Sequence, residues 1–151
     1  MLPSTTSRVP ENTAEYINER ILHEIEMNVA YFAGAGRKAI DSRLAELDRE
    51  WDIERILEAN AASFSLLGLA LGVALNRKWL LLPTAVASFL LQHALQGWCP
   101  PVPFFRRKGI RTSAEIDYER YALKALRGDF NDLPQRSDGS KASKILDAVM
   151  K

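Results

Sequence analysis

The chain contains one cysteine, the residue type best suited to covalent chemistry. Cys99 stands in the Gly-Trp-Cys-Pro-Pro run of residues 97–101. A thiol reacts as its thiolate, which a nearby cation favours and a helix C-terminus opposes. Two interpretations are therefore open. Cys99 is either a reactive thiol that accepts sulfur, forms a mixed disulfide or binds a metal ion, or an inert small hydrophobic residue at a helix end.

Three polar side chains near Cys99 form a second candidate site. Gln92, His93 and Gln96 interrupt an otherwise apolar run just before Trp98. Polar groups inside a membrane usually face another helix. This cluster is therefore either a polar notch that contacts a quinone or haem, or a hydrogen bond between two helices.

The remaining residues predict no catalytic or metal centre. The second histidine, His23, lies in a different segment, and two histidines with one cysteine lack the close spacing of a metal site. The chain has no glycine-rich phosphate loop, no Ser/His/Asp arrangement and no paired carboxylates in a credible pocket. We therefore predict no metal, no cofactor and no enzyme activity.

Composition narrows the class of protein further. The 151 residues include 20 Lys+Arg and 19 Asp+Glu, so the net charge of +1 gives no indication of a nucleic-acid partner. One cysteine excludes the disulfide-stapled secreted class. The hydrophobic fraction of 47% is ordinary for a soluble protein. The distribution of the charges along the chain is therefore more informative than their number.

Charged residues are absent from two long runs. No Asp, Glu, Lys or Arg occurs in the 18 residues between Glu58 and Arg77, or in the 27 between Lys78 and Arg106. A helix of 18 residues spans about 27 Å, close to the roughly 30 Å hydrocarbon core of a bilayer. The two runs predict a transmembrane helical hairpin over residues 59–105. The alternative is a soluble helical bundle with the hairpin as its core.

The ends of the second run fit the membrane interpretation. Trp79 and Trp98 are spaced to lie at opposite interfaces of a bilayer, where tryptophan is enriched. Basic residues are more numerous on the side away from the turn, so we expect both termini in the cytoplasm. Residues 1–12 show no signal-peptide pattern, so the hairpin itself is expected to direct insertion.

A GxxxG pattern predicts close helix packing in the first run. Gly68 and Gly72 allow two backbones to approach, and Ala61 and Ser65 extend the same small-residue face. The partner is either the second hairpin helix, through Ala85 and Ser88, or another copy of the chain.

The charged flanks predict amphipathic cytoplasmic helices. Asn12 and Glu15 have capping-box spacing, and Gly34 and Gly36 are expected to break the helix that they open. A further apolar stripe follows in residues 40–51, ending at Trp51. Thr112 and Glu115 again have capping-box spacing, and Gly128 is the expected end of that helix.

The predicted architecture is therefore all-α: a two-helix transmembrane hairpin flanked by amphipathic cytoplasmic helices. Its expected parts are a flexible leader (1–11), an amphipathic helical segment (12–58), the hairpin (59–105), a cytoplasmic helix (106–130), and a linker with a short terminal helix (131–151).

From residue 59 to about residue 130 the chain resembles the small YgaP-like transmembrane family of bacterial inner-membrane proteins. The family pattern is a two-helix hairpin, a Gly-x-Cys-Pro element and a Gly-x-x-Thr turn, here residues 97–100 and 109–112. The resemblance implies a two-pass inner-membrane protein. Some members carry a rhodanese sulfurtransferase domain, which implies a link to sulfane-sulfur handling, but no rhodanese active-site loop surrounds Cys99.

These observations lead to one function and two alternatives. We expect a structural, scaffolding or accessory subunit of a membrane complex, whose partners are the lipid bilayer and either other membrane-protein subunits or further copies of the chain. The first alternative is a thiol carrier at the membrane surface that uses Cys99. The second is a soluble helical interaction domain.

Overall fold

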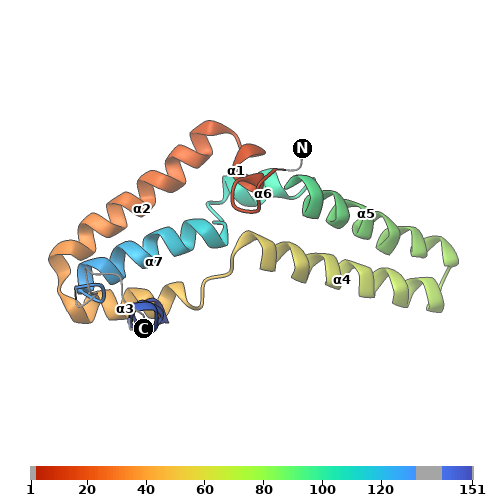
Figure 1. Ribbon diagram of the computed structural model, residues 1–151. Helices are drawn as coiled ribbons and strands as arrows, with labels where there is room; N and C mark the ends of the chain where they lie inside the picture. Colours follow the sequence, from red (N-terminus) through yellow and green to blue (C-terminus); the bar gives the residue numbers. More distant parts are fainter. Residues whose placement is uncertain (1–2, 132–140, 151) are drawn as a thin grey trace. The chain divides into compact units, whose positions relative to one another are not determined.

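The computed structural model describes residues 3–131 and 141–150, and all regular secondary structure in these ranges is helical (Figure 1). This confirms the predicted all-α class. The elements are α1 (Arg8–Glu11), α2 (Glu15–Ala35), α3 (Arg37–Leu47), α4 (Ile53–Ala74), the 3-10 helix η1 (Arg77–Leu80), α5 (Leu81–Gln96), α6 (Val102–Arg107), α7 (Ser113–Arg127) and α8 (Lys141–Met150).

The chain divides into two compact units. The hairpin unit comprises Met1–Leu22 and Trp51–Glu115, and the charged unit comprises His23–Glu50 and Ile116–Lys151. Helices α2 and α7 each begin in the hairpin unit and continue into the charged unit. The part of the predicted linker at residues 132–140 lies outside the described residues.

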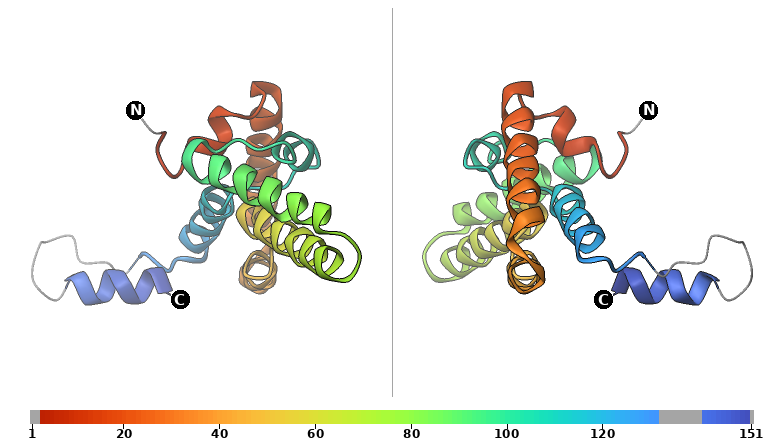
Figure 2. Two further views of the ribbon diagram at one scale, coloured as in Figure 1. Left: turned by 90° about the vertical axis from the view of Figure 1, so that its right-hand side faces the viewer. Right: turned by 90° about the vertical axis from the view of Figure 1, so that its left-hand side faces the viewer.

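The hairpin unit contains the two apolar runs as paired helices. Figures 1 and 2 show α4 and α5 side by side, joined through η1. Asp52 begins α4 by accepting a hydrogen bond from the Arg55 backbone N–H at 2.8 Å. Gly97 ends α5 in the left-handed conformation, with φ of 76°. The predicted hairpin is therefore present as a pair of helices.

The membrane prediction holds only in a coarser form. Among the described helices, α4 alone is long and apolar enough to cross a membrane, and few residues of its apolar stretch are buried. Helix α5 has 16 residues, because η1 takes the first turn of the second uncharged run. The part of the chain that the structure describes therefore presents one candidate membrane span.

The N-terminal segment is more ordered than the sequence predicts. We expected a flexible leader over residues 1–11, but residues 8–11 form α1 and Val9 is buried in the core of the hairpin unit. The predicted cap at Asn12 is also wrong, because α2 begins at Glu15. The Asn12 amide instead donates to the Gln96 carbonyl at 2.7 Å. A short polar side chain donates to a nearby carbonyl at a helix end, and here that carbonyl belongs to the last residue of α5.

The charged unit has its own apolar core. Ile40, Leu44 and Leu47 of α3 are buried together with Ile116 and Leu123 of α7. The apolar stripe of residues 40–47 therefore packs within the chain. Trp51, the last residue predicted for this stripe, does not.

Trp51 does not belong to this stripe, because α3 ends at Leu47. Its side chain is 48% exposed, and the Arg55 guanidinium lies 4.4 Å from the centre of its ring. Because α3 ends before Trp51, the helical spacing on which the prediction depended does not extend from Leu47 to Trp51.

Candidate functional site

The two glycines of the GxxxG pattern face the second arm of the hairpin. A Cβ atom added to Gly68 would lie 2.5 Å from Cδ of Pro83, and one added to Gly72 would lie 2.6 Å from Cδ2 of Leu80. Both glycines are buried. The glycines therefore allow close approach within one chain, which is the first of the two arrangements that the sequence left open.

The other small residues predicted for this contact lie elsewhere. Ala85 and Ser88 are exposed, and the Ser88 hydroxyl donates to the Thr84 carbonyl at 2.9 Å. Ala61 and Ser65 are half-buried on α4. The proline at position 83 and the leucines beside it fill the space over the glycines, so Ala85 and Ser88 are not needed there.

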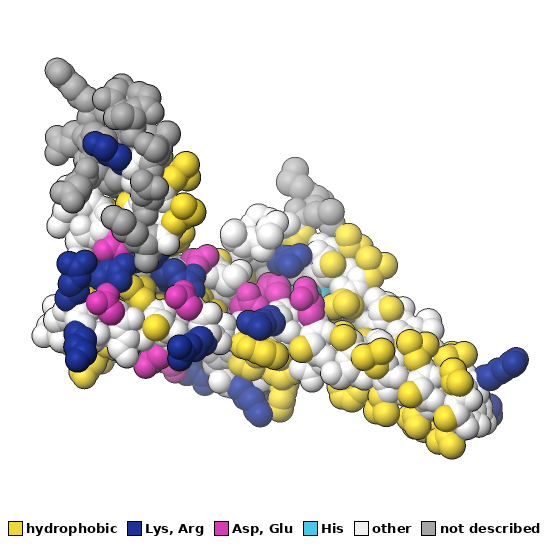
Figure 3. Space-filling model, turned by 90° about the horizontal axis from the view of Figure 1, so that it is seen from below, with side chains coloured by type: hydrophobic (Ala, Val, Ile, Leu, Met, Phe, Trp, Pro, Cys, Tyr) yellow, Lys and Arg dark blue, Asp and Glu magenta, His cyan; other side chains and the backbone are white. Residues whose placement is uncertain are grey.

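The outer faces of the hairpin are apolar. The space-filling view in Figure 3 shows hydrophobic side chains along the hairpin and basic side chains at its tip. The exposed fractions include 88% for Val73, 69% for Leu66 and 62% for Leu91. Contiguous apolar surface of this kind marks a site of contact with another protein or with a membrane.

The tip of the hairpin is short and polar. The Asn76 side chain accepts a hydrogen bond from the Lys78 N–H at 2.9 Å, which begins η1. Trp79 in η1 is 44% exposed, and Trp98 beyond α5 is half-buried. The two tryptophans therefore flank α5 at its two ends.

The base of the hairpin is joined to the N-terminal segment through Gly97. A Cβ atom at Gly97 would collide with the backbone carbonyl of Arg8, so a side chain here would displace α1. The Arg8 guanidinium donates to the Ala94 carbonyl at 2.9 Å. Together with the Asn12 bond, this satisfies carbonyls in the last turn of α5. The first residue of the Gly-x-Cys-Pro element is thus explained by packing.

The cysteine of the same element is buried. Cys99 is 3% exposed and packs in the core with Val9, Ile53 and Val102. Burial raises the pKa of its thiol, so the thiolate is disfavoured. Of the two interpretations of Cys99, this geometry favours the inert small hydrophobic residue.

The three residues of the predicted polar cluster at the end of α5 differ in burial. Gln96 is exposed, Gln92 is half-buried and His93 is 4% exposed. Neither ring nitrogen of His93 has a hydrogen-bond partner among the described residues. No hydrogen bond in the described part of the chain joins these three side chains.

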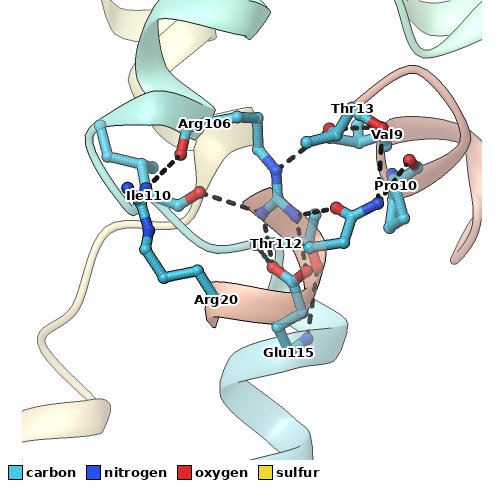
Figure 4. Close-up of polar contacts among 9 residues, drawn as sticks. Val9, Pro10, Thr13, Arg20, Arg106, Ile110, Thr112 and Glu115 are labelled. Carbon is cyan, nitrogen blue, oxygen red and sulfur yellow. Dashed lines mark hydrogen bonds and ion pairs between the residues drawn. The ribbon is translucent and has the colours of Figure 1, made fainter. Parts of the chain in front are cut away.

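Arg106 organises the base of the hairpin unit, as Figure 4 shows. Its guanidinium is fully buried and forms two hydrogen bonds to the Glu115 carboxylate, at 2.6 and 2.7 Å. It also donates to the Asn18 side chain at 2.8 Å, the Thr13 hydroxyl at 3.2 Å and the Ile110 carbonyl at 3.1 Å. All five guanidinium N–H groups are therefore used.

The carboxylate partner of Arg106 also begins α7. Glu115 accepts a hydrogen bond from the Thr112 N–H at 2.8 Å, and the Thr112 hydroxyl accepts from the Glu115 N–H at 3.3 Å. This is the predicted capping box. Burial alone would raise the pKa of Glu115, but the hydrogen bonds from Arg106 and Thr112 outweigh it and lower the pKa.

The sequence analysis missed Arg106 as a structural centre. The available signal was a basic residue directly after an uncharged run and nine positions before the acid of a capping box. Because all its donors are occupied within the chain, Arg106 fixes the hairpin base and leaves no donor for a ligand. The arrangement therefore holds elements together and presents no catalytic geometry.

A cavity of about 200 Å³ lies between the two arms, directly above the base. Its walls are almost entirely apolar, and Cys99 contributes to them. The lining residues are Leu57, Asn60, Ala61, Phe64, Val86, Phe89, Leu90, Cys99, Pro101 and Phe105.

The charged unit contains several ion pairs. Glu119 is fully buried and accepts from Arg43 at 2.8 Å, and Arg127 lies between Asp41 and Asp129. The hydrogen bond from Arg127 lowers the pKa of Asp129. No group of three His, Cys, Asp or Glu side chains within the described ranges is placed to hold a metal ion.

Comparison with known proteins adds no class to this description. The chain matches no protein-family model, no curated protein and no solved structure. The hairpin, its base and the cavity between its arms are therefore the features from which a function can be inferred.

Proposed function

We propose that this chain is a small two-pass protein of a bacterial inner membrane, with a structural or accessory role in a membrane complex. The observation that carries the proposal is the exposed apolar surface on both arms of the hairpin. No charged residue occurs between Glu58 and Arg77 in the first arm. In water such an apolar surface would favour aggregation, whereas in a bilayer the lipid chains solvate it.

The lengths of the arms support a hairpin that crosses the bilayer. Residues 59–74 of α4 and the 16 residues of α5 each span about 24 Å of helix. This is somewhat shorter than the roughly 30 Å hydrocarbon core, a mismatch that local thinning and snorkelling side chains accommodate. Arg77 and Lys78 are exposed at the tip and suited to snorkel to the far interface.

The distribution of basic residues supports cytoplasmic termini. The tip carries Arg77 and Lys78, whereas Arg55, Arg107 and Lys108 are among the basic residues near the other ends of the arms. An excess of Lys and Arg marks the cytoplasmic side. The resemblance of residues 59–130 to the YgaP-like transmembrane family agrees with this topology.

The accessory role is supported by aromatic side chains on the charged unit. Tyr31 is 71% exposed, Tyr118 57% and Tyr121 41%, whereas the leucines of α3 are buried within the unit. Exposed tyrosines are enriched at protein interfaces. We propose that these exposed tyrosines, and not the α3 stripe, contact the partner subunit.

Two engineered cysteines test the topology. In a Cys99→Ala background, Lys78→Cys at the tip and Lys108→Cys at the base are treated with a membrane-impermeant maleimide. We expect Lys78→Cys to react from outside intact spheroplasts and Lys108→Cys to react after permeabilisation. Labelling of both positions from the same side contradicts the two-pass topology, and extraction of the protein by alkaline carbonate contradicts membrane insertion altogether.

A size measurement tests the accessory role. We expect the protein extracted in mild detergent to migrate with other subunits or as an oligomer, and a Tyr31→Ser/Tyr118→Ser variant to migrate as a monomer. The control is Tyr16→Ser, which changes an exposed tyrosine of the hairpin unit. A monomeric wild-type protein contradicts the role.

A further inference from the structure

We infer that the cavity between α4 and α5 binds one acyl chain of an anionic phospholipid, with the lipid phosphate against Arg107 and Lys108. The inference rests on the proposed membrane placement of the hairpin. It assigns the hairpin a specific lipid in addition to the surrounding bilayer.

The cavity walls are suited to hydrocarbon and unsuited to water. Asn60 carries the one amide in the lining, and its Nδ2 already donates to the Ile56 carbonyl at 2.7 Å. A buried water needs two to four polar partners, and apolar cavities of about 150 Å³ stay dry and admit small hydrocarbons. A volume of about 200 Å³ therefore favours several methylene groups over solvent.

The cavity has a buried inner wall and is bordered by exposed aromatic rings. Leu57 and Cys99 belong to the buried core and form part of this inner wall. Phe64 and Phe89 also line the cavity but are 51% and 44% exposed. An acyl chain in the surrounding bilayer would therefore enter between these two rings.

Charge near the cavity selects the kind of lipid. Phe105 of α6 forms part of the wall, and Arg107 and Lys108 follow two and three residues later with exposed side chains. The Lys108 ammonium group lies 4.6 Å from the centre of the ring of Phe104, the residue before Phe105. Basic groups beside a membrane cavity on the cytoplasmic side bind anionic head groups.

Native mass spectrometry of protein released from nanodiscs tests the binding. The nanodiscs contain equal amounts of phosphatidylglycerol and phosphatidylcholine of different chain mass. We expect the wild-type protein to retain one phosphatidylglycerol. Ala61→Phe fills the cavity and should abolish this adduct, whereas the matched variant Ala62→Phe, on the exposed side of the same turn, should keep it.

A second pair of variants tests the head-group contact. Arg107→Gln with Lys108→Gln should retain a lipid but lose the preference for phosphatidylglycerol. Arg77→Gln with Lys78→Gln at the tip removes the same charge and should keep the preference. Equal loss of preference in both double variants overturns the assignment of the head group.

A thermal measurement on the wild-type protein covers the case in which Ala61→Phe does not fold. A lipid that binds the folded chain raises its melting temperature, so added phosphatidylglycerol should raise the Tm in detergent more than added phosphatidylcholine does. The inference is overturned if the two lipids raise the Tm equally, if Ala61→Phe and Ala62→Phe retain equal lipid, or if the adduct has the mass of a free fatty acid. These results are independent of carbonate extraction, which tests the membrane placement.

Discussion

At the scale of single residues, the buried Arg106 has the clearest energetic role. It joins α6, the segment that precedes α2, the start of α2 and the first turn of α7 through one guanidinium group. A buried ion pair adds little stability compared with apolar residues of similar volume in its place. Removal of only one partner, however, leaves a desolvated charge without a partner and is strongly destabilising. Arg106 is therefore more important to the integrity of the hairpin base than its sequence position indicates.

We expect Arg106→Ala to lower the free energy of unfolding by about 3–5 kcal/mol, because Glu115 is left without its main partner. Denaturant unfolding followed by circular dichroism in mild detergent measures this. Arg107→Ala is the control, since that side chain is exposed and should change stability little. Similar stability of the two variants would contradict the role of the buried pair.

The same pair predicts a pH dependence of stability. The pKa of Glu115 is lower in the folded chain than its ordinary value of 4.5, so its contribution is present above that value. The contribution is lost as the pH falls below 4.5 and through the lowered pKa. We expect the wild type to lose more stability than Glu115→Gln between neutral and acidic pH. Parallel pH profiles for the two proteins would show that Glu115 does not contribute in this way.

At the scale of elements, α1 closes the end of α5. The contact depends on Gly97, whose φ of 76° and missing Cβ admit the Arg8 backbone. Polar bonds from Arg8 and Asn12 to the last carbonyls of α5 then secure it. A segment that resembles a leader in sequence thus serves as the cap of a helix.

We expect Gly97→Ala to destabilise the hairpin unit by more than Gly109→Ala. Both glycines have positive φ, which costs an alanine about 1–3 kcal/mol, but nothing lies within 4 Å of a Cβ atom at Gly109. The difference between the two variants therefore measures the close approach of α1. Limited proteolysis should also cleave residues 3–12 faster in Gly97→Ala, and equal cleavage would show that α1 does not depend on this glycine.

At the scale of the whole molecule, the effect of a charge at an exposed leucine of the hairpin depends on whether water or lipid surrounds it. Leu66 lies midway along the uncharged part of α4 and is 69% exposed. In water a lysine at such a position is tolerated, whereas at the centre of a membrane helix it costs about 2.5–3.5 kcal/mol. One substitution therefore distinguishes the two environments.

We expect Leu66→Lys to move the protein from the carbonate-resistant membrane fraction into the extractable or degraded fraction. Leu146→Lys in the charged unit is the control, because it is the same substitution at a similarly exposed leucine, at 61%, that lies outside the hairpin. Quantitative immunoblotting of membrane and supernatant fractions measures the shift. Recovery of both the wild type and Leu66→Lys in the soluble fraction would favour the soluble helical domain, and normal membrane retention of Leu66→Lys would contradict a lipid-facing position for Leu66.

Local patterns were sufficient for several features of the fold. The Thr112–Glu115 capping box and the glycines that end α2 and α7 depend on neighbours within a few residues, so the sequence predicts them correctly. The pairing of α4 with α5 also follows, because a short polar turn forces two apolar helices together. The Asn12 cap failed because a distant carbonyl, that of Gln96, competed for the same side chain.

By itself, the sequence determined the all-α class and the uncharged hairpin, since these depend on composition and periodicity. Tertiary structure alone decided that Cys99 is buried, that Arg106 is satisfied on every N–H, and that Gly97 admits α1. Burial and hydrogen bonding arise between residues as many as 93 positions apart. No local pattern records such pairs, because only the folded backbone brings them within contact distance.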